Sequence, residues 1–407
     1  MPDIGIVGTG VAGLHLGLLL REQDIDATIY TDRAPEAAAN GRLPATVAHH
    51  APTLMREAAL GVQRWPGDTY GYGCHHHYVG GPTPLIFRGD FRAPSRAVDH
   101  RLYLPALAGD FQERGGDVVV RQVAPADLEH VAARHDLLVV ASGRGPLAGL
   151  FPTVADSATV EAPRRLLCAG LYHGVAPTAP KGVTLSIAPG RGEVIEIPLY
   201  SGAGHVTALL FECVPGGGAD ALCAADAGED QQRFLRALLD ELAHHHPTVF
   251  ERVAPADFGP TGPLDVVRTA ITPTVRADHT PLPGGRHALA LGDAHTTLDP
   301  IVGQGANSAS YSAQIVADAI AEDLAFDELF CRRVARRRAE FVLGAARWSE
   351  LMTRPPAEHI LRLLGAMSAH QSAADEFTDN FAHPDRQWRI VATAQRTQEF
   401  LRRHGAA

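Results

Sequence analysis

A glycine-rich turn near the N-terminus lies between an apolar run and a helical pattern. Gly8-Thr9-Gly10-Val11-Ala12-Gly13 directly follows Ile4-Gly5-Ile6-Val7 and precedes leucines at helical spacing. In such a strand-turn-helix unit, glycines permit a tight turn, close approach to a pyrophosphate and packing of the helix on the strand. The free N–H groups at the helix N-terminus attract a negative charge. The sequence therefore predicts a dinucleotide site at Gly8, Gly10, Val11, Ala12 and Gly13.

The second predicted strand, Ala27-Thr28-Ile29-Tyr30, lacks the acidic residue that usually binds a ribose at its end. Thr31 stands at that position, and Asp32 and Arg33 follow it. Ribose contact is therefore displaced or shared. Asp32 is a candidate ligand, and a solvated turn aspartate is an equally good interpretation.

Length and charge limit the class of protein. A chain of 407 residues exceeds what one hydrophobic core supports, so about two or three domains are expected. The net charge of −10 disfavours a nucleic-acid partner. No apolar run reaches membrane length and the N-terminus lacks a basic secretion signal, which predicts no membrane association and a cytoplasmic location. Five scattered cysteines without CxxC spacing indicate free thiols.

The pattern along the chain changes three times. Residues 1–48 form an opening βαβ unit, and residues 95–145 return to this style with a helix over 102–114 and a strand at 137–140 that runs into Ser142 and Gly143. Period-two alternation over 183–213, with turns at 189–192 and 201–204, predicts an antiparallel sheet. From residue 327 the pattern is helical, with a break at Pro355-Pro356.

A second glycine-containing segment follows far along the chain. The apolar run Leu289-Ala290-Leu291 leads to Gly292-Asp293, whose carboxylate is placed to accept hydrogen bonds from a ribityl hydroxyl. The turn from Gly303 to Asn307 then presents backbone N–H groups at a helix start, and such donors suit the pyrimidine edge of a flavin. The two motifs together predict a flavin site.

The order of these segments resembles the aromatic hydroxylases of the glutathione-reductase-like flavoproteins and, in more detail, the styrene and indole monooxygenases of two-component systems. The residues that carry the closer match are Gly5-Ile6-Val7-Gly8 through Leu14-His15-Leu16-Gly17-Leu18, Ile29-Tyr30-Thr31-Asp32-Arg33, Thr46-Val47-Ala48-His49, Tyr78-Val79-Gly80-Gly81-Pro82, Ala93-Pro94-Ser95-Arg96-Ala97-Val98-Asp99, Asp136-Leu137-Leu138-Val139-Val140 and Asp299-Pro300 through Asn307. The resemblance covers essentially the whole chain.

The resemblance implies an α/β fold with a glutathione-reductase-like, Rossmann-type FAD-binding domain, an inserted antiparallel substrate domain and a C-terminal helical segment. We expect the FAD-binding domain at 1–48, 94–165 and 285–330, the substrate domain at 49–93 and 166–284, and the helical segment at 331–407.

The resemblance also implies the activity. FAD reduced by a separate NADH-dependent flavin reductase would react with O2 to a C4a-(hydro)peroxyflavin, which would epoxidise a styrene-type aryl alkene; indole is the alternative small aromatic substrate. An apolar pocket would exclude water from this oxygen donor. The absence of a second nucleotide-binding loop independently favours external reduction, by transient docking of the reductase or by diffusion of the reduced FAD. A monomer or homodimer is expected.

Site residues follow from the resemblance position by position. Val47, His49, Tyr72, His75 and Ser95 match five of six positions that characterise styrene-type members, and Ala45 replaces the sixth, an asparagine. Ala45, Thr46 and Pro300 are the expected catalytic positions, and Arg42 is either a flavin-edge cation or a surface residue. The expected FAD contacts are Gly8, Gly10, Val11, Ala12, Gly13, Thr31, Asp32, Arg33, Arg42, Ser142, Gly143, Gly292, Asp293, Pro300, Gly303, Gln304, Gly305, Ala306 and Asn307.

Other features favour ordinary structural roles. His75-His76-His77 on a strand places at most two imidazoles on one face, so no metal site is expected. His295 either touches the cofactor or packs in the core. The run Arg332, Arg333, Arg336, Arg337 and Arg338 is interpreted as a solvated helix face.

Two alternative functions remain. A flavin-dependent halogenase needs a suitably placed lysine, and the chain has only Lys181, in a turn before a strand. A non-enzymatic flavin-binding sensor would bind oxidised FAD and form no oxygenated product.

Overall fold

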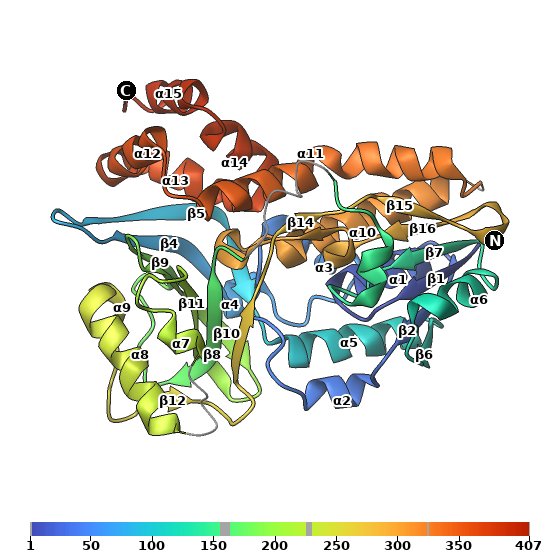
Figure 1. Ribbon diagram of the computed structural model, residues 1–407, viewed down its shortest axis with the longest axis horizontal. Helices are drawn as coiled ribbons and strands as arrows, with labels where there is room; N and C mark the ends of the chain where they lie inside the picture. The colour runs from blue at the N-terminus through green and yellow to red at the C-terminus, as the bar shows by residue number, and fades with distance from the viewer. Residues whose placement is uncertain (1, 155–162, 225–229, 324, 407) are drawn as a thin grey trace.

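The computed structural model describes residues 2–154, 163–224, 230–323 and 325–406. Helices cover a mostly parallel sheet in one part of the molecule, and a larger antiparallel sheet and a C-terminal group of helices lie beside it (Figure 1). This architecture confirms the predicted α/β class.

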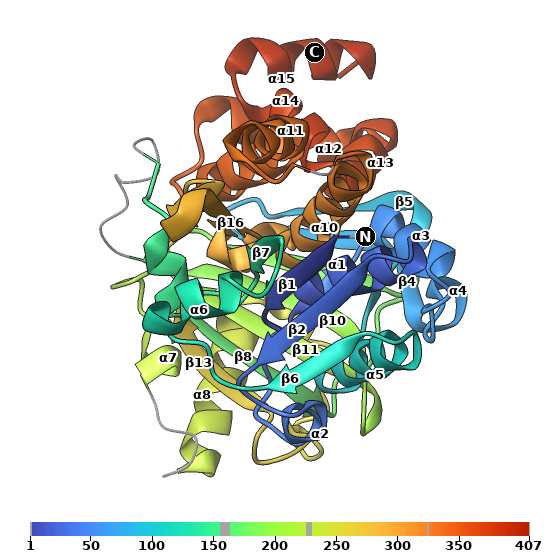
Figure 2. The same ribbon diagram turned by 90° about the vertical axis from the view of Figure 1, so that its right-hand side faces the viewer.

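The parallel sheet forms around the N-terminal glycine-rich turn. Its order places β1 in the middle, and only β15 runs antiparallel to its neighbour. Figure 2 shows β7, β1, β2 and β6 side by side. In sheet order the strands are β15 (His279–Leu282), β16 (Arg286–Ala290), β7 (Leu137–Val140), β1 (Asp3–Val7), β2 (Asp26–Thr31) and β6 (Asp117–Val120).

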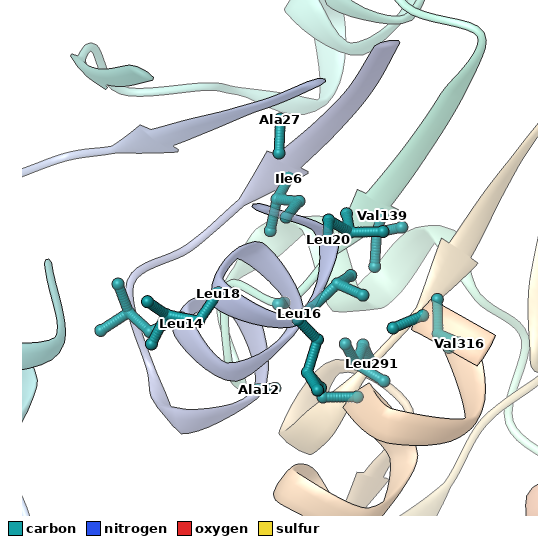
Figure 3. Close-up of a cluster of buried hydrophobic side chains, with 14 of the residues drawn as sticks. Ile6, Ala12, Leu14, Leu16, Leu18, Leu20, Ala27, Val139, Leu291 and Val316 are labelled. Carbon is teal, nitrogen blue, oxygen red and sulfur yellow. The ribbon is translucent and has the colours of Figure 1, made fainter. Parts of the chain in front are cut away.

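Three helices cover one face of this sheet because each presents an apolar side to it: α1 (Val11–Glu22), α5 (His100–Glu113) and α10 (Gly305–Glu322). Ile6 and Val139 of the sheet, Leu16 and Leu20 of α1, and Val316 of α10 share one buried cluster (Figure 3). The opposite face packs against α6 (Leu128–Ala132). Helix α1 is thus buried between the sheet and α10, which fixes the direction of its N-terminus.

The antiparallel sheet contains the two hairpins predicted over 183–213. β9 and β10, and then β10 and β11, pair in antiparallel register, whereas β4 joins β9 in parallel. In sheet order the strands are β12 (Gly259–Pro260), β8 (Leu166–His173), β11 (Gly204–Cys213), β10 (Gly192–Ser201), β9 (Gly182–Ala188), β4 (Gly71–Val79), β5 (Leu85–Ala97) and β3 (Ala48–His49), with β13 (Val266–Ala270) on β8.

The C-terminal helices confirm the predicted break at the double proline. They are α11 (Glu328–Met352), α12 (Glu358–Ala369), α13 (Gln371–Asp379), α14 (Pro384–Val391) and α15 (Ala394–Arg403). The arginine run on α11 forms a solvated face except at Arg338, which is 1% exposed, pairs with Asp278 at 2.7 Å and donates to the carbonyl of Ala290. Arg338 therefore ties α11 to the parallel sheet.

The remaining elements complete the described chain. They are α2 (Pro35–Ala39), α3 (Ala51–Ala59), α4 (Gly67–Tyr70), α7 (Ala221–Ala224), α8 (Gln231–His245), α9 (Pro247–Phe250), β14 (Thr274–Val275), β17 (Thr296–Thr297) and the 3-10 turns η1 (Pro125–Asp127), η2 (Pro146–Leu150), η4 (Pro283–Gly285), η5 (Gly292–Ala294), η6 (Pro300–Val302) and η7 (Asn380–Ala382). Within the described ranges, no helix is long and apolar enough to cross a membrane.

Element boundaries differ slightly from the sequence-based ones. The helix predicted from Leu102 begins at His100, because the side chain of Asp99 accepts a hydrogen bond from the N–H of Arg101 and caps it. The domain division stays a proposal. Strand β15 falls within the range 166–284 expected for the substrate domain, yet pairs with β16 of the parallel sheet.

The packing of α13 on β5 gives a stability prediction. A Cβ on Gly89 of β5 would lie 2.3 Å from the carbonyl oxygen of Ala374 and 2.1 Å from Oγ1 of Thr378. Gly89→Ala should therefore push α13 from the sheet and lower the free energy of unfolding by about 1–3 kcal/mol in urea denaturation. Gly73→Ala on neighbouring β4 is the control, because a Cβ there meets nothing within 4 Å. Equal stability of the two variants would contradict this packing.

Candidate active site

A groove of about 900 Å³ follows the carboxyl ends of the parallel strands and continues onto the antiparallel sheet. Turn residues after β1, β2, β7 and β16 line it, as expected for a ligand site at this edge of a parallel sheet. Leu167, Ala169 and Leu210 line it from the antiparallel side. We call it the cofactor groove.

The N-terminal turn is shaped for close approach of a ligand. Gly8 has a φ of +119°, and a Cβ on Gly13 would lie 2.0 Å from the carbonyl oxygen of Gly8, so both positions require glycine. A Cβ on Gly10 or Gly143 would meet nothing within 4 Å, which leaves open space beside the turn. No side chain caps α1, and its first N–H groups are free to bind a phosphate.

The second helix start, at α10, opens on the same groove. Gly303 lines it with a φ of +63°, and Pro300, Gly305 and Ala306 line it as well. Gln304 and Asn307 do not line the groove. The Gln304 amide donates to the carbonyl of Phe381 at 2.7 Å, and the Asn307 amide donates to that of Gly303 at 2.9 Å. These two side chains therefore hold the turn in place.

Positive charge exceeds negative charge along the groove. Three aspartates line it, Asp32, Asp293 and Asp299. The lining also contains six arginines, which are Arg33, Arg42, Arg101, Arg121, Arg144 and Arg268. In a chain with a net charge of −10, such a local surplus suits a ligand with two phosphates. The glycine turns, the free helix start and this surplus together fit FAD.

Sequence reasoning missed four of these arginines. Arg144 directly follows the Ser142-Gly143 turn and lies 3.9 Å from the Asp293 carboxylate, so the small-residue turn was an available signal. Arg101, Arg121 and Arg268 reach the groove from separate elements. No local pattern marks them.

The end of β2 has a buried hydroxyl where an acidic residue is usual. Thr31 is buried, and its hydroxyl lies 3.0 Å from that of Thr9 and 3.0 Å from the carbonyl oxygen of Arg33. The side chains of Asp32 and Arg33 are exposed, 3.6 Å apart. A displaced ribose contact through Asp32 remains a prediction.

The expected catalytic and substrate positions divide into two groups. Ala45, Thr46, Val47 and Pro300 line the cofactor groove. The other expected substrate positions do not line it; these are His49, Tyr72, His75 and Ser95.

Tyr72 and His75 of β4 belong to a cluster of rings with Phe91 of β5, His50 before α3 and Phe381 of η7; we call these five residues the aromatic cluster. Phe91 is half-buried and the other four are buried. The ring of His75 lies 4.7 Å from that of Phe91 and 4.5 Å from that of Phe381. His50 lies 5.9 Å from Phe91. The cluster therefore joins the antiparallel sheet to η7, the turn between α13 and α14.

The aromatic cluster also adjoins the cofactor groove. Nδ1 of His50 lies 2.8 Å from the hydroxyl of Ser95, and Nε2 lies 3.9 Å from the position of a Cβ on Gly303. Burial lowers the pKa of His50 to about 3 and lowers that of His75, and it raises the pKa of Tyr72. At neutral pH these rings are uncharged.

His49 lies in a different environment, a buried ion network. Glu57 of α3 and Arg96 of β5 are both fully buried and lie 2.8 Å apart. Nδ1 of His49 lies 3.0 Å from the Glu57 carboxylate, and the Tyr103 hydroxyl donates to it at 2.8 Å. His100, which lines the groove, has its ring 5.8 Å from that of His49. The network thus lies behind the groove wall.

Two further histidine features have structural explanations. His295 is buried, with Nε2 3.3 Å from Asp278 and Nδ1 2.7 Å from the Thr296 hydroxyl, so it packs in the core. His75 and His77 share a face of β4, as predicted, with ring centroids 6.2 Å apart. Among the described residues, no group of three or more histidines, cysteines or carboxylates is arranged to hold a metal.

The glycine geometry gives a second prediction. Gly10→Ala should weaken FAD binding by about tenfold, about 1.4 kcal/mol, because the added methyl enters the open space beside the turn, while the melting temperature stays unchanged. Gly13→Ala should instead destabilise the fold itself, because its Cβ meets the Gly8 carbonyl. FAD titration by fluorescence and thermal unfolding of both apoproteins separate the two effects. Tight FAD binding by Gly10→Ala would refute this placement.

The ion network gives a third prediction. Burial alone would raise the pKa of Glu57, but the hydrogen bond with His49 and the charge of Arg96 outweigh it and lower the pKa from 4.5 to about 2. Glu57 therefore stabilises the fold fully above about pH 4.5, and this contribution is lost as pH falls toward 2. Glu57→Gln leaves Arg96 buried without its partner and should cost about 3–5 kcal/mol at pH 7.

Urea denaturation at pH 7 and pH 3 measures both effects. The exposed Glu113→Gln on α5 is the matched control and should behave as the wild type. If Glu57→Gln loses as much stability between pH 7 and pH 3 as the wild type does, other groups cause that loss and the prediction is wrong.

Comparison with known proteins places this groove in a family. A family profile described as "Styrene monooxygenase A putative substrate binding domain" matches residues 143–252. The chain is similar to styrene monooxygenase StyA of Pseudomonas sp, 43% identical over 97% of this chain and 96% of the relative, and to StyA of Pseudomonas fluorescens, 42% identical over 98% of both.

Solved structures agree on the fold. A variant of the flavin-dependent brominase Bmp2 aligns with a TM-score of 0.68 at 16% identity, over 99% of this chain and 100% of that one. A variant of halogenase PltM in complex with FAD aligns with a TM-score of 0.63 at 13% identity, over 100% of this chain and 96% of that one. The full-length identity to the two curated relatives shows that the chain belongs to the styrene monooxygenase StyA family and is an FAD-dependent monooxygenase.

Proposed function

We propose that this protein is the oxygenase component of a two-component system. It uses FAD reduced by a separate NADH-dependent flavin reductase, together with O2, to epoxidise styrene-type aryl alkenes. The observation that carries the proposal is the position of the aromatic cluster, whose residue His50 lies against the Gly303 turn of the cofactor groove. This position would bring an aromatic substrate to the flavin edge.

External reduction is supported by the single glycine-rich phosphate cradle found among the described residues, at Gly8–Gly13. Ser142 and Gly143 line the same groove, and no acidic residue follows them in the turn to Gly145. A site for a second dinucleotide would need its own set of backbone donors. The reductase is therefore proposed to supply reduced FAD by diffusion or transient docking.

FAD, once bound and reduced, supplies the oxygen activation, and the chain's residues bind, orient and exclude water. The uncharged rings of the aromatic cluster present apolar faces to an aryl group, and Val47 and Pro300 extend that surface into the groove. Three buried polar atoms have no described hydrogen-bond partner: the Tyr72 hydroxyl, Nδ1 of His75 and Nε2 of His50. They would orient a substrate with few polar contacts.

Indole is the alternative substrate, because it differs from styrene mainly in carrying an N–H group. Ala45 lines the groove where styrene-type relatives are expected to have asparagine. A methyl group here leaves room and removes an amide that would discriminate between the two substrates. Substrate preference is therefore proposed to depend on this position.

A halogenase function is disfavoured despite the structural neighbours. The single lysine, Lys181, precedes β9 and is not among the residues that line the cofactor groove. The neighbours are under 20% identical and therefore support the fold alone.

The direct test mixes anaerobically reduced FAD and protein with oxygenated styrene or indole. Styrene oxide in an amount close to that of the reduced FAD, resolved by chiral chromatography, is the expected result. Reoxidation that gives only H2O2 with both substrates would reject the proposal and favour a flavin-binding sensor. Indole products in excess would favour the alternative substrate.

A fourth prediction concerns Ala45. Ala45→Asn should raise the styrene-to-indole ratio of kcat/KM by up to about tenfold, about 1.4 kcal/mol in the barrier, because the amide refills the space at the groove wall. Ala37→Asn, on the exposed side of α2, is the control. If the styrene-to-indole ratio of kcat/KM does not change, residue 45 does not determine substrate preference.

A further inference from the structure

Three carboxyl groups and one guanidinium gather beside the start of the Pro300 turn. Glu193 of β10 and Glu212 of β11 are paired in the sheet register, and their side chains share one face. Asp299 precedes Pro300, and Arg165 precedes β8. Glu212 and Asp299 are both 0% exposed.

The guanidinium of Arg165 is fully used by other partners. Its Nε and Nη2 donate to the two oxygens of Glu193, each at 2.8 Å, and its Nη1 donates to the carbonyls of Arg164 and Thr353. Arg165 therefore neutralises Glu193. Glu212 and Asp299 have no comparable partner of their own.

Glu212 and Asp299 face each other. No described N–H or O–H group donates to either oxygen of Glu212 or to Oδ2 of Asp299, and Oδ1 of Asp299 accepts only from the N–H of Ile301 at 3.1 Å. Two ionised carboxylates in this buried position would repel each other strongly, because no water screens their charges. Burial, and then the charge of Asp299, raise the pKa of Glu212, and burial raises the pKa of Asp299.

The pair adjoins the cofactor groove from two sides. Leu167, which lies opposite Glu212 in the β8–β11 register, lines the groove, and so does Leu210 on the same face of β11. Asp299 and Pro300 line it from the turn. A change of charge in the pair would therefore act on the wall that holds the flavin.

We propose that Glu212 and Asp299 share one proton at neutral pH, and that this proton-holding pair positions the Pro300–Gly303 turn and keeps the wall of the FAD site from carrying a second negative charge. Loss of the proton places two negative charges beside a cofactor that is itself an anion. The hold on FAD then weakens as pH rises. The inference rests on FAD binding alone and is independent of the oxygenated product.

The shared proton has a spectroscopic signature in the cofactor-free protein. Wild-type protein at neutral pH should show the infrared carbonyl stretch of a protonated carboxyl group, and this band should be absent from Glu212→Gln. Titration of the wild-type band to high pH should remove it without unfolding. A wild type without the band, or a Glu212→Gln variant that keeps it, would overturn the proposal.

The functional consequence is measured as the dissociation constant of FAD against pH. If FAD binds only the protein that carries the shared proton, the dissociation constant of FAD rises by up to about tenfold for each pH unit above the pKa of the pair. We expect the wild-type protein to show this rise. In Glu212→Gln the pair carries one negative charge at most, so the dissociation constant of FAD should not change over the same pH range. Exposed Glu251→Gln is the control and should follow the wild type.

Parallel pH profiles for wild type and Glu212→Gln would overturn the proposal. If Glu212→Gln does not fold, the wild-type infrared titration still decides the first claim. Neither measurement depends on epoxide formation, so failure of the proposed function and failure of this inference are distinguishable.

Discussion

The site depends on a close approach between three backbone segments at Gly292. A Cβ on Gly292 would lie 3.0 Å from Cβ of Ala12 in α1 and 4.0 Å from Cβ of Ala309 in α10. Small residues at this point let the turn after β16 fit between the two helices. Their N-termini, nearly three hundred residues apart in sequence, consequently open on one groove. Each start offers free backbone donors, and together they bracket an anionic, elongated cofactor.

Buried charge supports the groove from behind. The Glu57–Arg96 pair connects α3 to β5, and Arg338 connects α11 to the parallel sheet through Asp278. Buried pairs of this kind add little net stability over apolar packing, but loss of one partner is costly. Here these pairs fix the relative positions of elements, because the aromatic cluster and the groove wall belong to elements that the pairs join. His49 illustrates this, since the position expected to touch substrate lies within the ion network.

Sequence reasoning succeeded where a feature depends only on residues that are close together in the sequence. The GxGxxG turn, the hairpins over 183–213 and the helix break at Pro355-Pro356 are local patterns, and the structure contains each of them. Ala45, Thr46, Val47 and Pro300, chosen by resemblance, all line the groove. Reasoning from spacing failed to identify Arg101, Arg121 and Arg268, because each reaches the groove from an element whose local pattern is unrelated to the cofactor.

The sequence by itself determined the opening βαβ unit, the hairpins over 183–213, the break between the C-terminal helices, the glycine positions that admit a dinucleotide, and the family to which the chain belongs. These follow from periodicity and backbone freedom, which are properties of neighbouring residues. Only the tertiary structure decided which side chains share a site: that His50, Phe91 and Phe381 join Tyr72 and His75, and that Glu212 faces Asp299. Such pairs come from elements brought together by packing, and the pKa of a buried group depends on neighbours that sequence distance does not reveal.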